Sequence, residues 1–373
     1  MKNIFIYSSD GFPTKKNPNL GIFNFEQGKA LKKYKVHFFD LSTNNTKEIL
    51  FDNYDGFEIY RLLNCRFNIF KILYNFFFIK KISKKYKPLI IIASFLNIKN
   101  VIYSLFINSK KIVLIHGSDA NTKGFIRKFI FKFYLNKLDK IICVSNYTKK
   151  ILLNNYKNIK KKIKVVHNGF SREKLNKIDY QFKKKITKKG KLSILTIANL
   201  VPRKNIGDVI KIFNEINLKM KNKFHLNIVG QGSEKNDLLN LIKYYKLEQN
   251  INIFSNLSNS KLASIFETSR FFFLFSKSYR HEFEGFGIVF LEAMYKKNII
   301  FASKNGGMTD ILKNNKNAFT FNAENSNYKN KVLQTFFRII ANKSLQKKII
   351  KNASNYSKNF SWEKNINLII NSL

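Results

Sequence analysis

The stretch of the sequence best suited to chemistry runs from residue 282 to residue 294, EFEGFGIVFLEAM. It places three carboxylates, Glu282, Glu284 and Glu292, around two glycines, in a chain with only 23 acidic residues against 68 Lys and Arg. Carboxylates accept hydrogen bonds from sugar hydroxyls, and the amino end of a helix binds anions such as a diphosphate. The stretch therefore predicts either a site for a ligand that carries both groups, or a plain helix cap with a solvated Glu292.

The start of the expected helix decides how these carboxylates are presented. A helix that begins near Gly287 places Glu284 in the loop just ahead and Glu292 near the second turn. On one continuous helix, two residues eight apart would lie about 12 Å apart along the axis. The loop-plus-helix placement instead lets both carboxylates face one extended ligand, one holding a hexose and the other a ribose.

The elements that must position this stretch follow from a repeated pattern of short apolar runs, each followed by a polar turn and a helical pattern. Strands that alternate with helices indicate parallel sheets covered on both faces, a doubly wound α/β class. A length of 373 residues favours two such domains. We expect one domain at residues 1–170, a charged linker region at 171–190 and a second domain at 191–357. The expected strands are IFIYS, VHFFDL, LIIIASF, KIVLIHG, KIICVS and IKVVHNG, then LSILTIANL, FHLNIVG, INIFSN, FFFLFS and NIIFASKNGG.

The formal net charge of +45 favours a polyanionic partner or an anionic surface. The chain is also rich in Lys, Asn, Ile and Phe, whose codons are rich in A and T, so genomic base bias is a competing account of the charge. The lysines are spread along the chain, and no zinc-finger spacing or aromatic RNP run occurs. These observations argue against nucleic-acid binding.

The remaining composition points to a soluble or peripheral cytoplasmic protein. Two cysteines, Cys65 and Cys143, provide no disulfide framework, which suits a reducing compartment. The apolar start is too short for a signal peptide, and the longest apolar runs fall far below the roughly 20 residues of a spanning helix.

The stretch EGFGIVFLEAM resembles the retaining GT-B glycosyltransferases of glycosyltransferase family 4, whose mark is two glutamates separated by seven residues. Glu284 and Glu292 keep that spacing. Further motifs follow in the family's order over most of the chain. They are HGSD at 116–119, CVSNYTKK at 143–150, VVHNGF at 165–170, ANLVPRKNI at 198–206, IVGQGSEKNDL at 228–238 and SKNGGMTDIL at 303–312.

The resemblance implies a set of donor-binding residues. Glu284 would contact the donor sugar and Glu292 the ribose, while Lys204 would neutralise the leaving diphosphate, where negative charge grows as the glycosidic bond breaks. Arg203 is the neighbouring donor-site cation. Without the flanking motif, an ordinary exposed pair in a lysine-rich chain would be the preferred reading of Arg203 and Lys204. The backbone N–H groups that would hold the diphosphate belong to Phe286, Gly287 and Ile288.

One position departs from the family pattern. Family members often carry an arginine ahead of the LVPRK segment, also directed at the diphosphate, and this chain has Asn199 there. Either Arg203 or another basic residue compensates, or phosphate is held less strongly.

In the first domain the resemblance implies that His116 lies against the donor sugar near the reacting carbon. Asp119 would orient its loop or meet the acceptor, and His167 is expected to be structural. The glycine Gly21 would let the backbone approach phosphate or acceptor, a plain glycine turn being the alternative. By analogy, Gly230 and Gly232 line the nucleotide pocket.

The resemblance also implies the architecture and the reaction. Two Rossmann-like domains would face a cleft, with a C-terminal helix at 358–373 crossing back to the first domain. No Asp-x-Asp motif or metal-ligand spacing occurs, so we expect a metal-independent hexosyltransferase that uses a UDP- or GDP-sugar as co-substrate, needs no cofactor and acts by front-face displacement.

The expected acceptor is a glycan or a lipid-linked glycan of the bacterial envelope, such as a polysaccharide or lipopolysaccharide precursor. Residues 66–87, RFNIFKILYNFFFIKKISKKYK, mix aromatic residues with lysines over a length suited to an interfacial helix on the inner face of the cytoplasmic membrane. A buried helix with a lysine-rich outer face is the alternative. The rival function is a basic membrane- or nucleic-acid-binding protein on a degenerate GT-B scaffold.

Overall fold

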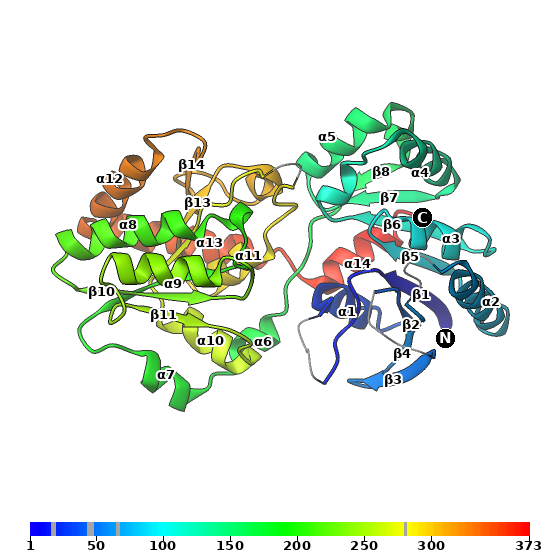
Figure 1. Ribbon diagram of the computed structural model, residues 1–373, viewed down its shortest axis with the longest axis horizontal. Helices are drawn as coiled ribbons and strands as arrows, with labels where there is room; N and C mark the ends of the chain where they lie inside the picture. The colour runs from blue at the N-terminus through cyan, green and yellow to red at the C-terminus, as the bar shows by residue number, and fades with distance from the viewer. Residues whose placement is uncertain (16–19, 43–47, 65–67, 280–281) are drawn as a thin grey trace. The chain divides into compact units, whose positions relative to one another are not determined.

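The computed structural model describes residues 1–15, 20–42, 48–64, 68–279 and 282–373. The chain divides into two compact units, the first made of Met1–Gly169 and Ser361–Leu373 and the second of Phe170–Phe360 (Figure 1). Each unit is built on a sheet of mainly parallel strands connected by helices, which is the two-domain α/β class that the alternating pattern predicts.

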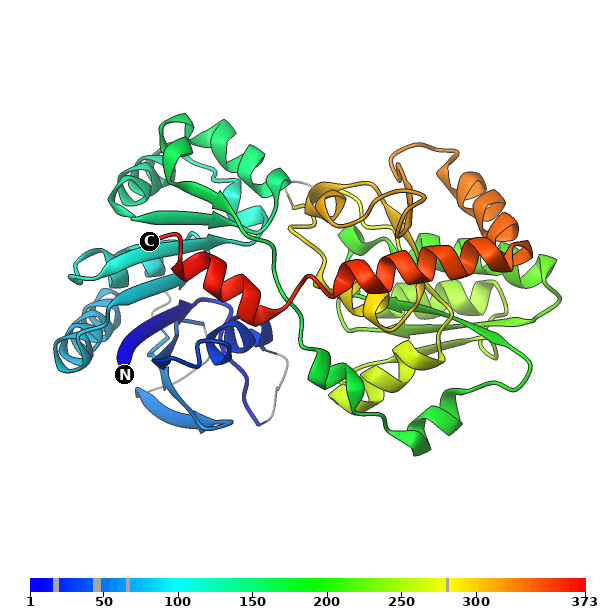
Figure 2. The same ribbon diagram turned by 180° about the vertical axis from the view of Figure 1, so that it is seen from behind.

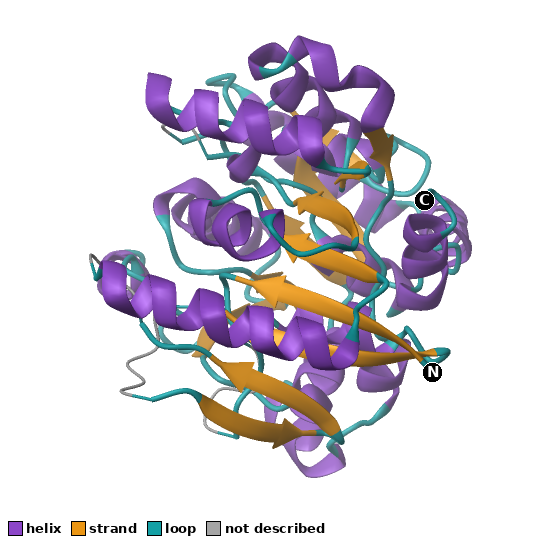
Figure 3. Ribbon diagram, turned by 90° about the vertical axis from the view of Figure 1, so that its right-hand side faces the viewer, coloured by secondary structure: helices purple, strands orange, loops and turns teal. Residues whose placement is uncertain are grey.

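The sheet of the first unit has the strand order β3-β4-β2-β1-β5-β6-β7-β8. All neighbouring pairs are parallel except the β3–β4 hairpin, and helices lie on both faces of the sheet (Figure 3). Covered parallel strands read as continuous apolar runs, and the central strands here are buried along most of their length. The strands are β1 Lys2–Ser8, β2 Tyr34–Asp40, β3 Leu50–Tyr54, β4 Phe57–Arg61, β5 Ile90–Ser94, β6 Lys110–Ile115, β7 Lys140–Cys143 and β8 Ile163–Val165.

The helices of the first unit include one from the far end of the chain. Helix α14 lies beside α1 (Figure 2), where Gln27 Nε2 donates to Asn365 Oδ1 at 2.7 Å and Asn365 Nδ2 donates to the carbonyl of His167 at 2.8 Å. The segment therefore completes the core of the first unit. The helices are α1 Ile22–Lys29, α2 Ile69–Tyr86, α3 Ile98–Leu105, α4 Phe125–Lys137, α5 Asn146–Asn155 and α14 Trp362–Ile370, with 3-10 turns η1 Ser118–Ala120 and η2 Lys157–Lys162.

The second unit has a parallel sheet in the order β11-β10-β9-β12-β13-β14. Its strands are β9 Leu192–Ile197, β10 Phe224–Val229, β11 Ile251–Phe254, β12 Phe271–Leu274, β13 Ile299–Ser303 and β14 Phe319–Phe321. Its later helices are α8 Ile206–Lys219, α9 Lys235–Tyr244, α10 Asn259–Thr268, α11 Ile288–Tyr295, α12 Tyr328–Ala341 and α13 Lys343–Ser357, with 3-10 turns η3 Pro202–Lys204 and η4 Gly306–Asp310.

The segment 171–190, expected as a linker region, differs from that expectation. It forms the short helices α6 Arg172–Asn176 and α7 Tyr180–Ile186, which both pack against α10 and belong to the second unit. Asp179 caps α7 by accepting from the N–H of Phe182, and its own N–H donates to Ser264. The segment is rich in charged residues and poor in apolar periodicity, so its sequence did not indicate these contacts. Among the described residues, no helix has the length and apolar character needed to cross a membrane.

Candidate active site

Helix α11 begins directly after Gly287, so Glu284 lies in the preceding loop and Glu292 in the helix, as the sequence predicts. Gly287 has a φ of 86°, and a Cβ there would lie 2.7 Å from the ring of Phe290. Only glycine fits this turn without strain. No described side chain caps the helix, so N–H groups of its first turn remain available to an anion.

Glu284 is the centre of an ionic cluster in the second unit. Its Oε2 contacts Lys204 Nζ directly and lies 3.2 Å from Arg203 Nη1. Burial on its own would raise the pKa of Glu284, but the positive charges of Lys204 and Arg203 outweigh it and lower the pKa below its ordinary value. The carboxylate is therefore ionised at neutral pH. Glu282 is exposed, and its carboxylate lies 3.6 Å from Arg203 Nε.

The turn that carries Arg203 and Lys204 is held by residues that the sequence reasoning did not single out. The N–H of Lys277 donates to the carbonyl of Arg203 at 2.8 Å. The next residue, Asn205, donates to Asp208 Oδ2 at 3.0 Å, and Tyr328 donates to the same oxygen at 2.5 Å. In the sequence, the closeness of Asp208 to the LVPRK segment could have indicated that it supports this turn.

Glu292 lies on α11, close to α6. Burial raises the pKa of Glu292 to about 7, and the charge of Lys174 on α6 opposes that rise. The two glutamates of the family spacing thus have different protonation behaviour: Glu284 is ionised, and Glu292 titrates near neutrality. A carboxyl group that titrates near neutrality loses its proton more readily when a bound ligand donates hydrogen bonds to it.

The glycines of the second unit allow close contact between loops. A Cβ at Gly230 would lie 1.9 Å from the carbonyl oxygen of Ala198, and a Cβ at Gly232, two residues further on, would lie 2.3 Å from the carbonyl oxygen of Leu200. The N–H of Gly307 donates to the carbonyl of Glu284 at 2.7 Å. These contacts join the loop after β9 to the loop after β10, and the loop after β12 to the loop after β13, at the carboxyl edge of the sheet. Asn199 lies exposed in the loop after β9.

In the first unit, His116 directly follows β6 and Asp119 folds back onto the same loop. Asp119 Oδ1 accepts from the N–H groups of His116 at 3.0 Å and Gly117 at 2.7 Å, and Oδ2 accepts from Leu96 N–H at 3.2 Å. Burial raises the pKa of Asp119 to about 6, while these N–H groups lower it. Of the two roles considered, these contacts fit loop orientation.

Other sequence-predicted residues of the first unit take structural positions. Gly21 is the amino cap of α1, with a φ of 53°, close to the carbonyl of Gly11. His167 accepts through its carbonyl from Asn365 of α14. Cys143 is a buried free thiol, and Cys65 lies outside the described residues.

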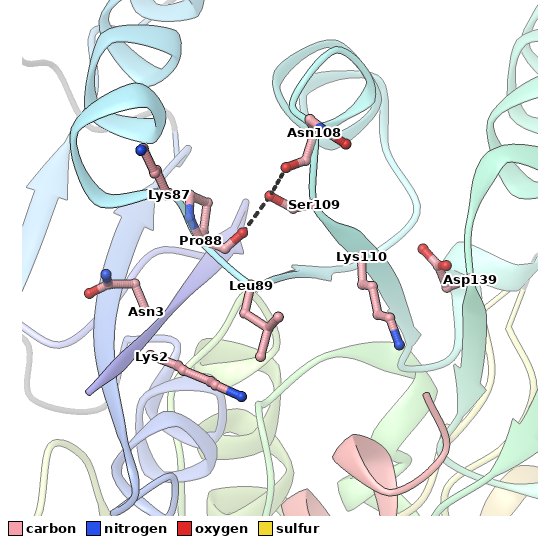
Figure 4. A pocket seen from close by; sticks show the side chains of 9 residues that line it. All are labelled: Lys2, Asn3, Lys87, Pro88, Leu89, Asn108, Ser109, Lys110 and Asp139. Carbon is pink, nitrogen blue, oxygen red and sulfur yellow. Dashed lines mark hydrogen bonds between the residues drawn. The ribbon is translucent and has the colours of Figure 1, made fainter.

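A pocket of about 590 Å³ opens at the amino-terminal edge of the first sheet (Figure 4). Its lining includes Lys2, Lys110 and Asp139, the last of which already accepts from the N–H of Lys111 at 2.8 Å. Ligands of open parallel sheets bind at the carboxyl ends of the strands, where His116 lies. We therefore assign the pocket in Figure 4 no part in the site. In the described part of the chain, no group of three or more His, Cys, Asp or Glu has a metal-binding arrangement.

Comparisons with known proteins agree with this architecture. Residues 24–174 match the model of Glycosyltransferase Family 4, and residues 177–356 match that of Glycosyl transferases group 1. An uncharacterized glycosyltransferase of Methanocaldococcus jannaschii is 31% identical over 269 residues, which is 68% of this chain and 65% of that protein. The chain thus matches less than two thirds of the length of this relative.

Solved structures share the fold along the whole chain. Anabaena HepE in complex with UDP-glucose has a TM-score of 0.77 at 14% identity, covering 100% of both chains. WaaG, a glycosyltransferase involved in lipopolysaccharide biosynthesis, has a TM-score of 0.70 at 12% identity, covering 98% of each chain. The chain thus has the two-domain GT-B fold of these structures, and its two halves match two glycosyltransferase models in turn, Glycosyltransferase Family 4 first and Glycosyl transferases group 1 second.

Proposed function

We propose that the protein is a retaining glycosyltransferase whose second unit binds a nucleotide-sugar donor and whose first unit binds the acceptor. The observation that carries the proposal is the cluster of Glu284, Lys204 and Arg203 just ahead of α11, with Glu292 on that helix. This cluster offers a carboxylate for sugar hydroxyls, N–H groups and cations for a diphosphate, and a second carboxylate for the ribose.

Lys204 acts on the leaving group. Without donor, its charge is balanced by Glu284. As the glycosidic bond breaks, negative charge grows on the diphosphate oxygen, and the attraction of Lys204 and the α11 amino end for that oxygen increases. An interaction that is stronger in the transition state than in the ground state lowers the barrier.

The stereochemical part of the proposal is front-face displacement. The acceptor oxygen attacks the anomeric carbon on the side from which the diphosphate leaves, and a departing phosphate oxygen takes the acceptor proton. The anomeric configuration is then retained without a protein nucleophile, and no metal or cofactor is assigned a step.

A UDP-sugar is the first donor candidate, with a GDP-sugar as the alternative. Support for uridine comes from HepE, whose similarly folded structure is in complex with UDP-glucose. Support for an envelope glycan comes from WaaG, which is involved in lipopolysaccharide biosynthesis.

The acceptor that we propose is lipid-linked. A groove of about 890 Å³ lies between the amino ends of α3 and α4 in the first unit. Apolar side chains of Phe125, Ile126 and Ile130 line it together with the cations Lys99 and Arg127, and its described lining contains no carboxylate. Apolar walls with two cations are complementary to a hydrocarbon chain that carries a phosphate.

The experiment that tests the proposal is a thermal-shift screen with UDP-, GDP-, ADP- and CDP-sugars, followed by a transfer assay with the stabilising donor. A ligand that binds only the folded state raises the melting temperature, by an amount that grows with concentration. We expect a UDP-sugar to do so. A folded protein that none of these donors stabilises, but that binds vesicles or nucleic acid, would instead fit a degenerate GT-B scaffold.

A further inference from the structure

The ring of His116 is connected to a chain of buried polar side chains in the first unit. Its Nε2 lies 2.8 Å from Ser94 Oγ, and Ser94 Oγ donates to Asn24 Oδ1 at 2.6 Å. The amide Nδ2 of Asn24 in turn donates to Ser8 Oγ at 2.9 Å. Ser8, Asn24 and Ser94 are all fully buried.

The topology explains why these residues meet. Ser8 ends β1 and pairs with Ser94 at the end of the neighbouring strand β5, and His116 follows the next strand, β6. Asn24 comes from the first turn of α1. All four therefore lie at the carboxyl edge of the sheet, where ligands of this fold class bind.

The direction of these hydrogen bonds determines where the imidazole carries its proton. A serine hydroxyl has one proton, and Ser94 donates it to Asn24. Ser94 Oγ can therefore only accept a hydrogen bond from His116. The short distance between Ser94 Oγ and His116 Nε2 thus requires a proton on Nε2. The other ring nitrogen, Nδ1, has no hydrogen-bond partner among the described residues, and His116 is half-buried.

Neighbouring groups hold the ring in place and keep it neutral. The ring of Phe23 lies 4.9 Å and that of Phe95 4.5 Å from the imidazole, centroid to centroid. Phe95 has a φ of 78°, which is strained for a bulky residue, and Asn100 donates to its carbonyl at 2.7 Å. Burial lowers the pKa of His116 to about 3.

We propose that Ser94 and Asn24 are positioning residues that fix His116 in the Nε2–H tautomer, so that Nδ1 presents a lone pair to a hydroxyl of the bound substrate. The role of the lone pair rests on the proposed transferase function, whereas the tautomer does not. A neutral acceptor at this place orients a hydroxyl without adding charge to the site.

The test is a long-range 1H–15N correlation spectrum of the imidazole groups at pH 7, in which the two neutral tautomers have distinct patterns. The chain has five histidines, and the His116 signals are identified by their loss in His116→Gln. We expect the Nε2–H pattern in the wild type. A wild-type proton on Nδ1 overturns the proposal, whatever the activity of the protein.

Three variants test the relay. Asn24→Ala frees the Ser94 proton to bond Nε2, so the tautomer should change to Nδ1–H, while Ser94→Thr keeps the hydroxyl and should keep the wild-type pattern. Ser104→Ala is the matched control, because Ser104 is equally buried and its hydroxyl bonds Tyr134 and the backbone carbonyl of Asn100 instead of a side chain of the relay. An unchanged tautomer in folded Asn24→Ala overturns the relay.

Transferase activity tests the proposed role of the Nδ1 lone pair of His116. With UDP-glucose as the donor probe and release of UDP as the readout, Asn24→Ala should lower kcat about tenfold, the worth of one hydrogen bond, and leave the KM within about twofold. Ser94→Thr and Ser104→Ala should stay near the wild type. An altered tautomer with unchanged kcat overturns the role of Nδ1. Failure of the wild type to bind or turn over any nucleotide sugar counts against the proposed function, and the spectra still decide the tautomer.

Discussion

Glu284 and Glu292 belong to one motif, yet their surroundings shift their pKa values in opposite directions. Glu284 is held by two cations, whereas the charge of Lys174 only partly offsets the effect of burial on the pKa of Glu292. The exposed Glu282 touches only the edge of the cluster. This contrast makes the three carboxylates a matched set for mutation.

We expect Glu284→Gln to lower turnover while binding of bare UDP stays nearly intact, because the proposed function assigns this carboxylate to the transferred sugar. Glu292→Gln should weaken both donor and UDP, because the proposed function assigns it to the ribose. A hydrogen bond to a charged group is worth roughly 1.5 to 3 kcal/mol, or about ten- to a hundredfold in affinity. Calorimetric titration with UDP and kinetics with the donor check both. Glu282→Gln is the control, and the assignment fails if Glu282 is indispensable while the other two tolerate substitution.

Lys204→Ala should lower kcat more than it changes the affinity for donor, because in the proposed function the lysine stabilises charge that grows in the transition state. Single-turnover kinetics separate the chemical step from binding. Arg203→Ala is a useful partner, since Arg203 contacts the same carboxylate oxygen at a longer distance and should have the smaller effect. If Lys204→Ala lowered the affinity for donor without slowing the chemical step, the result would contradict this role for Lys204.

The pKa of Glu292 predicts a pH dependence of nucleotide binding. With a pKa of about 7, the free protein is increasingly protonated below neutrality. In the proposed site a ribose donates hydrogen bonds to the carboxylate form of Glu292, so binding favours deprotonation, and affinity for UDP should rise up to about tenfold between pH 6 and pH 8. Glu292→Gln should abolish this slope. A wild-type slope that persists in the variant assigns the titration to another group.

At the scale of elements, α2 and α4 leave aromatic faces uncovered. In α2 the exposed apolar residues are Ile69, Phe70, Leu73, Tyr74 and Phe77, and in α4 they are Phe125, Ile126, Phe129 and Phe133. The buried residues of α2 include Asn75, Ile79 and Ser83. Residues 66 and 67 of the expected interfacial segment lie outside the described part, but the outward aromatic face is the arrangement that membrane docking requires.

Binding to vesicles should therefore rise with the fraction of anionic phosphatidylglycerol and fall with salt. Phe129→Ser with Phe133→Ser on α4 should reduce it several-fold, because both side chains are exposed and contribute apolar area. A suitable control is Leu218→Ser, an equally exposed apolar residue of the second unit. Equal binding to neutral vesicles, or no binding, leaves codon bias as the sufficient account of the net charge.

At the scale of the whole molecule, a buried histidine links stability to pH. Both ring nitrogens of His225 in β10 are buried without a hydrogen-bond partner among the described residues. Burial, followed by the charges of Lys188 and Lys191, lowers the pKa of His225 to about 4. The unfolded state binds a proton below about pH 6.5 and the folded state does not, so the stability present above that pH is lost as pH falls towards 4.

The difference in unfolding free energy between the wild type and His225→Leu should therefore change by about 2 kcal/mol between pH 6.5 and pH 5, in favour of the variant at low pH. Urea titrations followed by circular dichroism measure it. Other titrating groups cancel in this difference, since they are common to both proteins. A difference that does not vary with pH would show that His225 does not titrate abnormally.

Much of the architecture could be predicted because its signals are local. Each apolar run quoted from the sequence coincides with a strand. Such a run and the turn residues that bound it lie within about ten residues, so the strand can be recognised from local sequence alone. The helix start after Gly287 was predictable for the same reason. The hairpin of β3 and β4 and the strand β14 were missed, because β3 is largely exposed and β14 has only 3 residues.

The sequence by itself thus determined the alternating elements, the family spacing of Glu284 and Glu292, and the excess of positive charge. Only the tertiary structure decided that Lys204 and Arg203 meet Glu284, some 80 residues away, and that Asn24 and Ser94 meet His116. It also decided that 171–190 packs into the second unit. The physical reason is that strand order brings distant loop ends together, and both the contacts and the pKa shifts of a site depend on that order.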